Sequence, residues 1–236
     1  MGLRSPSSLG SAPMSKTIDN FDLIKEKLLE FKKPGDFYVV HVIQRMKDKK
    51  AAGSVNPGDS TGDNQRLIKT WYIDSLDYWD TKVPLMKEIA EANNARAYIL
   101  PTVRNRLTIN RVLLKKMVDM IDDTNCRYDH LIRTAVCGCH TSTKPFWVVD
   151  LDKEMASDIH KTDEDKLAWL DNWADDIVDD LSRYVSETSR KPNEIFKVPT
   201  VNGIHIVTPP FDRTKWPLNP DLLKKDPMTL LYYKQP

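Results

Sequence analysis

The chain has 236 residues, of which 40% are hydrophobic and 29% charged, so it can form one or two globular domains around a buried core. Its formal net charge of +1 gives no overall attraction to nucleic acid or to a membrane surface. The three cysteines do not suit a secreted disulfide framework and no apolar run is long enough to span a membrane, so we expect a cytoplasmic protein.

The first half of the chain alternates helical and extended patterns. Residues 1–15, rich in serine, glycine and proline, are expected to be a disordered leader or tag. Apolar residues at helical spacing predict helices at about 19–33, 75–94 and 108–123. Runs of β-branched and aromatic residues predict strands at 37–43, 66–73 and 96–100. Glycines and a proline in residues 49–64 predict a mobile surface loop.

The second half repeats this alternation. An apolar strand is predicted at 146–151, and the capping-box spacing of Thr162 and Asp165 predicts a helix that lasts to about Glu187. One apolar stripe of that helix contains Leu170, Trp173, Ile177, Leu181 and Tyr184.

Shorter segments complete the chain. Extended pieces are predicted at 195–198 and 204–207, and the proline-rich residues 209–236 are expected to form an arm or an irregular cap. We therefore predict an α/β (α+β) fold in which a mixed sheet is flanked by helices.

Charge is distributed unevenly along the chain. Residues 16–116 hold 19 Lys and Arg against 13 Asp and Glu, whereas residues 150–187 hold 4 against 13. Residues 92–118 contain no acid and include Arg104, Arg106 and Arg111. Such a segment suits a phosphate backbone or a triphosphate, although basic residues on a helix are more commonly a solvated face.

Two carboxylates follow an apolar strand in residues 146–152, whose sequence is FWVVDLD. Because side chains alternate along a strand, Asp150 and Asp152 share one face while Val149 and Leu151 take the other. Two such carboxylates repel each other unless a divalent cation lies between them, and hard oxygen ligands suit Mg²⁺ or Mn²⁺. The alternative is that the strand ends at Asp150 and both acids are solvated.

A histidine lies on a later strand. The alternation that turns Ile204 and Ile206 into the core leaves His205 on the other face, beside Gly203, which has no side chain to block a ligand. His205 is better suited to a phosphate or nucleotide contact than to Mg²⁺, which prefers oxygen. A histidine in a strand is more often a structural residue with satisfied hydrogen bonds.

Together these two segments resemble the archaeo-eukaryotic primase and primase-polymerase superfamily. A hydrophobic strand ending in two acids is matched by residues 147–152, and a small-residue turn before a histidine by residues 202–205. The resemblance spans 146–208, about a quarter of the chain, and implies an RRM-like core. It implies that Asp150 and Asp152 bind the catalytic Mg²⁺ or Mn²⁺ and that His205, with Asn202 and Gly203, contacts the incoming nucleotide.

This resemblance suggests a division of the chain. We expect a leader at 1–15, a basic α/β part at 16–125, a primase-like core at 126–208 and a C-terminal arm at 209–236. The whole chain, including residues 94–99 (NARAYI), also looks like uncharacterised phage and mobile-element proteins of Bacteroidetes. If the chain is viral, the expected location is the cytoplasm of the host cell.

The family's third motif, an acid on a later strand, has no clear match. Only Asp212, Asp221 and Asp226 lie in the proline-rich end, and none follows an apolar strand. A missing third carboxylate weakens a mechanism in which two metals clamp the attacking and leaving oxygens.

The cysteines offer a rival site. Four potential zinc ligands fall within fifteen residues, namely Cys126, Cys137, Cys139 and His140. Because no two pairs have the usual spacing of zinc ligands, free thiols in a loop are favoured over structural zinc.

The sequence thus predicts a nucleotidyltransferase that is dependent on Mg²⁺ or Mn²⁺ and acts on nucleoside triphosphates with a DNA or RNA template. No membrane partner is expected. The alternative is a catalytically silent nucleic-acid-binding protein, in which the acids and the histidine are structural and the basic segment carries binding.

Overall fold

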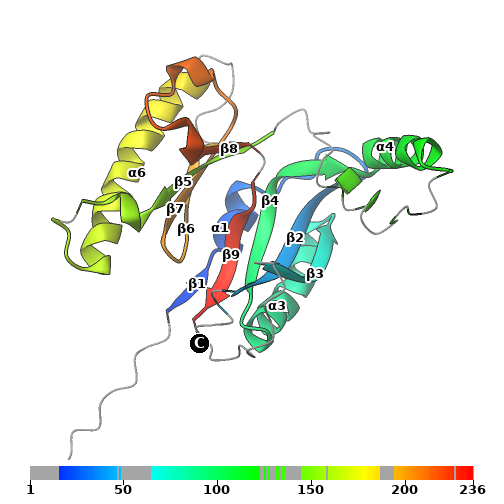
Figure 1. The fold of residues 1–236 in the computed structure, drawn as a ribbon, viewed down its shortest axis with the longest axis horizontal. Helices are drawn as coiled ribbons and strands as arrows, with labels where there is room; N and C mark the ends of the chain where they lie inside the picture. Colours follow the sequence, from blue (N-terminus) through cyan, green and yellow to red (C-terminus); the bar gives the residue numbers. More distant parts are fainter. Residues whose placement is uncertain are drawn as a thin grey trace, which may run out of the picture.

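The computed structural model describes residues 16–46, 48, 65–122, 125, 127, 131–132, 134–136, 145–157, 159–186, 194–225 and 227–235. The described strands form a five-stranded sheet in the order β1-β9-β4-β2-β3 and a four-stranded sheet in the order β6-β7-β5-β8 (Figure 1). The strands are β1 (Thr17–Asp19), β2 (Asp36–Arg45), β3 (Gln65–Ile73), β4 (Arg96–Asn105), β5 (Trp147–Asp152), β6 (Phe196–Pro199), β7 (Gly203–Thr208), β8 (Leu223–Lys225) and β9 (Thr229–Lys234). The α-helices are α1 (Phe21–Lys27), α3 (Leu76–Ala92), α4 (Arg106–Asp119) and α6 (Asp163–Ser186).

The fold mixes helices and strands, as predicted, but its sheets differ from the mixed sheet that was expected. Every pairing among the described strands is antiparallel. One cause is local, because residues 200–202 between β6 and β7 are too few for a parallel crossover. The Thr200 N–H donates to the Gly203 carbonyl at 2.8 Å and closes this turn. The prediction of a mixed sheet is therefore wrong, because the described strands form two antiparallel sheets.

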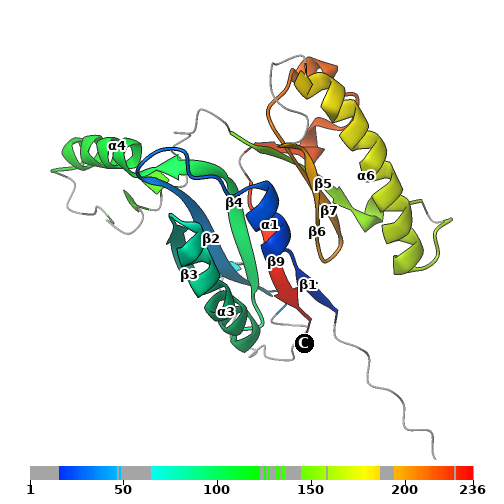
Figure 2. The ribbon, with the colours of Figure 1, turned by 180° about the vertical axis from the view of Figure 1, so that it is seen from behind.

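Helices α1 and α3 cover one face of the five-stranded sheet (Figure 2). Phe21 and Ile24 of α1 and Trp79 and Met86 of α3 are buried in the cluster that they share with β2 and β4. The rings of Phe21 and Trp79 meet edge to face with centroids 5.3 Å apart. Burial of these large apolar side chains fixes both helices on the sheet.

Helix α6 covers the face of the four-stranded sheet that lies away from the five-stranded sheet (Figure 1). The predicted apolar stripe is confirmed, because Leu170, Ile177 and Leu181 are buried while Trp173 and Tyr184 pack partly buried against the same cluster. The predicted cap is also present, since the Asp165 N–H donates to Thr162 Oγ1 at 3.0 Å. The strongly acidic helix is thus held by its apolar side.

The two sheets share a buried core. Val148 of β5 and Val207 of β7 belong to the same apolar cluster as α1 and the five-stranded sheet. The buried Asn20 side chain strengthens this junction, because its Nδ2 donates to the Pro199 carbonyl at 2.9 Å and to the Leu230 carbonyl at 3.0 Å. The junction places one face of β5 and β7 against the five-stranded sheet.

The C-terminal segment contains the largest difference from the prediction. Residues 209–236 were expected to be an arm or irregular cap, yet β9 lies within the five-stranded sheet, paired with β1 on one side and β4 on the other. Leu230, Leu231, Tyr232 and Tyr233 are all buried. All prolines of this segment except Pro236 precede β9, and the apolar run at 229–233 has the composition of a buried strand.

Most other predicted elements are found close to their expected positions, but the helix expected at about 19–33 is shorter than predicted and ends at Lys27. β4 continues to Asn105 instead of ending at Leu100, because its ladder with β2 is irregular next to Pro101, where a missing N–H is tolerated. The expected leader at 1–15 and the expected loop at 49–64 lie outside the described residues. Within the described part of the chain, no helix is long and apolar enough to cross a membrane.

Candidate functional site

The acid pair and the histidine lie on neighbouring strands. β5 and β7 pair with Asp150 directly opposite His205 and Asp152 opposite Gly203. The His205 Nε2 atom lies 3.2 Å from Asp150 Oδ1. The structure thus places Asp150 and His205 on the same face of two neighbouring strands.

Strand alternation separates these polar residues from the core under α6. Val149, Leu151, Ile204 and Ile206 belong to the buried cluster that packs against that helix. The intervening side chains point the other way, toward the five-stranded sheet. The apolar pattern of both strands thus places their polar residues at the junction between the sheets.

A cavity of about 360 Å³ lies at this junction. The four-stranded sheet contributes Asp150, Asp152 and His205, while β2, β3, β4 and β9 of the other sheet supply much of the remaining wall. The lining residues are Ile43, Arg45, Gln65, Arg96, Tyr98, Asp150, Asp152, Thr200, Val201, Asn202, His205, Pro227, Met228 and Leu230. The two acids and the histidine thus line one cavity.

The other ring nitrogen of His205 contacts the five-stranded sheet. Its Nδ1 atom lies 3.0 Å from the Oγ1 of Thr229, the first residue of β9. Thr229 is fully buried, so its hydroxyl is shielded from any substrate and is unsuited to act as a nucleophile. His205 is thus held between a carboxylate of one sheet and a hydroxyl of the other.

Asp150 is stabilised in its ionised form. The hydrogen bond from His205 is the main cause that lowers the pKa of Asp150, and the positive charges of Lys224 and Arg45 act in the same direction. Burial opposes this shift, but the net effect is a pKa below the ordinary value. The cavity therefore contains a carboxylate that is charged at neutral pH.

The arginines that line the cavity differ in their partners. Arg96, at the start of β4, forms a buried bidentate pair with Asp48, in which Nε lies 2.8 Å from Oδ2, and it stacks over the ring of Tyr233. Arg45, at the end of β2, is half-buried and lies close enough to Asp150 to lower its pKa. Arg96 is therefore neutralised by a protein carboxylate, and Arg45 brings positive charge to the acid pair.

The predicted phosphate-binding arginines do not line this cavity. Arg104 is fully buried and donates from Nε to the Val136 carbonyl at 3.1 Å and from Nη1 to the Thr102 carbonyl at 3.2 Å. The expectation that Arg104 contacts a phosphate is wrong for this structure, because strand β4 extends past it and turns its side chain inward.

Arg106 and Arg111 lie on α4, at the end of the molecule away from α6 (Figure 1). Arg106 is exposed and pairs with Asp74 at 2.7 Å, and Arg111 is exposed. The structure therefore does not bring these two arginines to the acid pair, and their predicted contact with nucleic acid concerns a separate surface.

Gly203 serves the pairing of β7 with β5 more directly than it serves a ligand. A Cβ atom on Gly203 would lie 1.8 Å from the Leu151 carbonyl oxygen, a distance that no side chain tolerates. Asn202 lines the cavity, and its carbonyl accepts a hydrogen bond from the Lys153 N–H at 2.7 Å. The expected glycine turn is thus required for close approach of the strands.

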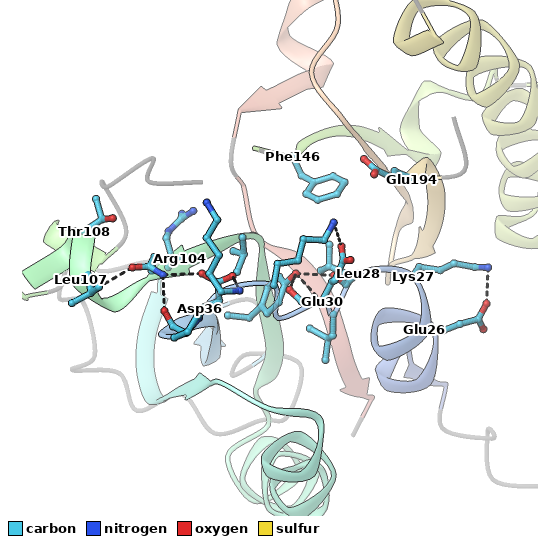
Figure 3. A pocket seen from close by; sticks show the side chains of 17 residues that line it. Glu26, Lys27, Leu28, Glu30, Asp36, Arg104, Leu107, Thr108, Phe146 and Glu194 are labelled. Carbon is cyan, nitrogen blue, oxygen red and sulfur yellow. Dashed lines mark hydrogen bonds and ion pairs between the residues drawn. The ribbon is translucent and has the colours of Figure 1, made fainter. Parts of the chain in front are cut away.

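A larger cavity, of about 740 Å³, lies beside the end of α1 and the start of β2 (Figure 3). Its walls include three lysines and Arg104, but also the acids Glu26, Glu30, Asp36 and Glu194. Two of these lysines are paired locally, Lys27 with Glu26 at 2.6 Å and Lys32 with Glu30 at 2.7 Å. This balance of charge favours no particular ligand.

The remaining candidate metal ligands either lie away from the acid pair or fall outside the described residues. Within the described ranges, no group of three or more His, Cys, Asp or Glu side chains is placed to hold a metal ion. Asp212 caps a short turn through Thr214, and neither Asp212 nor Asp221 lines the cavity. Asp226 and the candidate zinc ligands lie outside the described residues, namely Cys126, Cys137, Cys139 and His140.

Comparison of the chain with models of known protein families, with curated proteins and with solved structures finds no match.

Two residues of the site had no place in the sequence prediction. Thr229 was hidden because the whole C-terminal segment was expected to be irregular, although the run Thr-Leu-Leu-Tyr-Tyr at 229–233 has strand composition. Arg45 lies two residues after the end of a predicted strand, but only the packing of one sheet against the other brings it to Asp150.

Proposed function

We propose that the protein is a metal-dependent nucleotidyltransferase of the primase-polymerase type, which acts on nucleoside triphosphates and a DNA or RNA template in the cavity between the two sheets. The observation that carries this proposal is the convergence of Asp150, Asp152 and His205 on one face of two paired strands. These are the residues through which the sequence resembles the primase-polymerases.

The two carboxylates fit a divalent cation. Mg²⁺ in enzymes is commonly held by one or two carboxylates together with substrate phosphates and water, so a pair of acids on one strand face is a suitable donor set. The lowered pKa of Asp150 keeps this carboxylate ionised at neutral pH, as a metal ligand must be. When bound, the cation supplies electrostatic stabilisation of the charge that develops on the phosphate oxygens.

The other residues of the cavity suit the rest of a nucleotide. Arg45 offers a charged contact to phosphates from the five-stranded sheet, His205 holds Asp150 in place from the four-stranded sheet, and Tyr98, Met228 and Leu230 offer an apolar wall to a base or sugar. In the proposed reaction the oxygen of a 3′ hydroxyl bonds to the α-phosphate and its proton passes to water, while the α–β anhydride bond breaks and pyrophosphate leaves. These residues would hold the triphosphate in line for that displacement.

The proposal is tested by the dependence of nucleotide binding on metal. We expect a fluorescent nucleoside triphosphate to bind the wild-type protein in Mg²⁺ or Mn²⁺ and to dissociate when a chelator is added. Binding should be lost when Asp150→Asn is combined with Asp152→Asn, and it should be retained in Asp179→Asn, a control on α6 outside the cavity. Nucleotide binding that depends on neither metal nor acid pair would contradict the proposal.

The same experiment separates an enzyme from the alternative of a silent binding module. A module that uses only its basic surface would bind single-stranded DNA without requiring a divalent cation, and it would not bind the triphosphate. That outcome would assign the acids and His205 to a structural role.

A further inference from the structure

His205 has a hydrogen-bonding partner on each ring nitrogen, and the two partners come from different sheets. Nε2 lies 3.2 Å from Asp150 Oδ1, and Nδ1 lies 3.0 Å from Thr229 Oγ1. The His205 side chain is only 15% exposed, and Thr229 is fully buried. The imidazole is therefore fixed at both nitrogens in the wall of the cavity.

The chemistry of these partners determines which nitrogen carries the hydrogen. An ionised carboxylate only accepts hydrogen bonds, so the nitrogen beside Asp150 must be the protonated one. In a neutral imidazole the other nitrogen, Nδ1, is then an acceptor and requires a donor. The Thr229 hydroxyl is the group within hydrogen-bonding distance that can donate to it.

We propose that Thr229 is a positioning residue of the cavity: its hydroxyl donates to Nδ1 of His205 and so holds the histidine as the Nε2–H tautomer, with that hydrogen directed at Asp150. The contribution of Thr229 to catalysis rests on the proposed nucleotidyltransferase function. The tautomer itself is a property of the protein and does not depend on any reaction.

This arrangement makes the C-terminal strand part of the site. Thr229 begins β9, which is paired with β1 and β4 in the five-stranded sheet, whereas His205 belongs to the four-stranded sheet. The hydrogen bond between them therefore lets a side chain of the five-stranded sheet orient a cavity residue of the four-stranded sheet. A change in the packing of the two sheets would alter the direction in which His205 presents its hydrogen.

The chain contains a matched control pair. His41 of β2 and Thr70 of β3 are directly opposite each other, and His41 Nδ1 lies 2.9 Å from Thr70 Oγ1. His41 is buried, as is Thr229, but neither His41 nor Thr70 lines the cavity that contains Asp150. Thr70→Val removes an equivalent hydroxyl from a histidine outside the proposed site.

The test is the nitrogen-15 NMR spectrum of the histidine side chains in the full-length protein at mildly alkaline pH, with His205 assigned from the resonances that vanish in His205→Gln. We expect wild-type His205 to carry its hydrogen on Nε2. Thr229→Val should shift part of the population to the Nδ1–H form, and Thr229→Ser should restore the wild-type spectrum. Thr70→Val should shift only the resonances of His41.

Two results would overturn the assignment. A wild-type spectrum in which His205 carries its hydrogen on Nδ1 would exclude the assigned tautomer. This result needs no variant, so the test stays decisive even if Thr229→Val does not fold. An unchanged His205 spectrum in folded Thr229→Val would show that the hydroxyl does not select the tautomer.

Kinetics separate this inference from the proposed function. If nucleotide incorporation is observed, Thr229→Val should lower kcat by about tenfold with little change in KM, and Thr229→Ser should recover most of the rate. An equal loss of kcat in Thr229→Val and Thr229→Ser would indicate a merely structural effect and would contradict a positioning role for the hydroxyl. If the wild-type protein incorporates no nucleotide, the proposed function fails while the NMR experiment still decides the tautomer.

Discussion

Asp150 and His205 are directly opposite each other on β5 and β7, and the imidazole Nε2 lies 3.2 Å from the carboxylate Oδ1. The carboxylate is 39% exposed and the imidazole 15%, so the histidine is the more deeply held partner. Their contact joins the acid strand to the histidine strand at the wall of the cavity. Any ligand of Asp150 therefore meets a carboxylate whose orientation His205 restrains.

The contact predicts a stability contribution that depends on pH. The pKa of Asp150 in the folded chain lies below its ordinary value of 3.8, mainly because of the hydrogen bond from His205. The contribution is thus fully present above about pH 4, the pKa range of an aspartate in the unfolded chain, and is lost as the pH falls through the folded pKa. Urea denaturation should show a shallower loss of stability below about pH 4 in Asp150→Asn than in the wild type. If unfolding free energy plotted against pH gave parallel curves for the wild type and Asp150→Asn, the pKa of Asp150 would not contribute to stability.

Gly203→Ala should be strongly destabilising. The new Cβ would lie 1.8 Å from the Leu151 carbonyl oxygen, and this clash with backbone forces β5 and β7 apart. We expect a loss of unfolding free energy of roughly 3 kcal/mol or more. Gly35→Ala is the comparison, because there the Cβ finds ordinary contacts and only the positive φ of 82° is strained, at a cost of about 1 kcal/mol. Equal losses for the two variants would contradict the close approach of the strands.

Arg45→Gln should weaken nucleoside triphosphate binding by roughly tenfold, since a charge-assisted hydrogen bond is worth about 1.5 kcal/mol or more. Arg45 is the arginine of the cavity whose charge reaches Asp150, whereas Arg96 is paired with Asp48. Arg66→Gln, an exposed residue of β3 outside the cavity, should leave the affinity unchanged. Titration with a fluorescent triphosphate compares the variants, and equal weakening in both would show that the effect is one of net charge alone.

The exposed arginines of α4 lead to a separate prediction. If Arg106 and Arg111 contact a nucleic-acid backbone, their combined reversal to Glu should weaken single-stranded DNA binding and reduce its salt dependence. The magnitude of the slope of log K against log salt concentration should decrease by roughly 1 to 2, as expected for two lost phosphate contacts. Anisotropy titrations over a salt series measure that slope. If the slope is unchanged, both arginines belong to solvated surface.

The sequence was a good guide to the face of the site that β5 and β7 form. Both strands alternate apolar and polar residues, and a strand period of two assigns each side chain to a face without knowledge of the rest of the fold. The alternation assigns Asp150, Asp152 and His205 to the polar faces of their strands. The pairing of these strands is a long-range contact, because α6 and β6 lie between β5 and β7 in the chain.

The opposite wall of the cavity depends on contacts between distant parts of the chain. Thr229 meets His205 because β9 returns to the first sheet, and Arg45 meets Asp150 because the two sheets pack against each other. Arg104 was misread for a related reason, since the strand that buries it was expected to end at Leu100. Strand pairing order and strand length are set by tertiary packing, which a single sequence does not display.

Nucleotide incorporation by the acid-pair variant tests the central claim most directly. Wild-type protein is incubated with labelled nucleotides, primed or unprimed template and either Mg²⁺ or Mn²⁺, beside the combined Asp150→Asn and Asp152→Asn variant, whose folding is verified by its urea transition. We predict extension by the wild type that requires the metal, and no extension by the variant. Wild-type protein that incorporates no nucleotide with either metal, or a variant that retains the wild-type rate, would contradict the account.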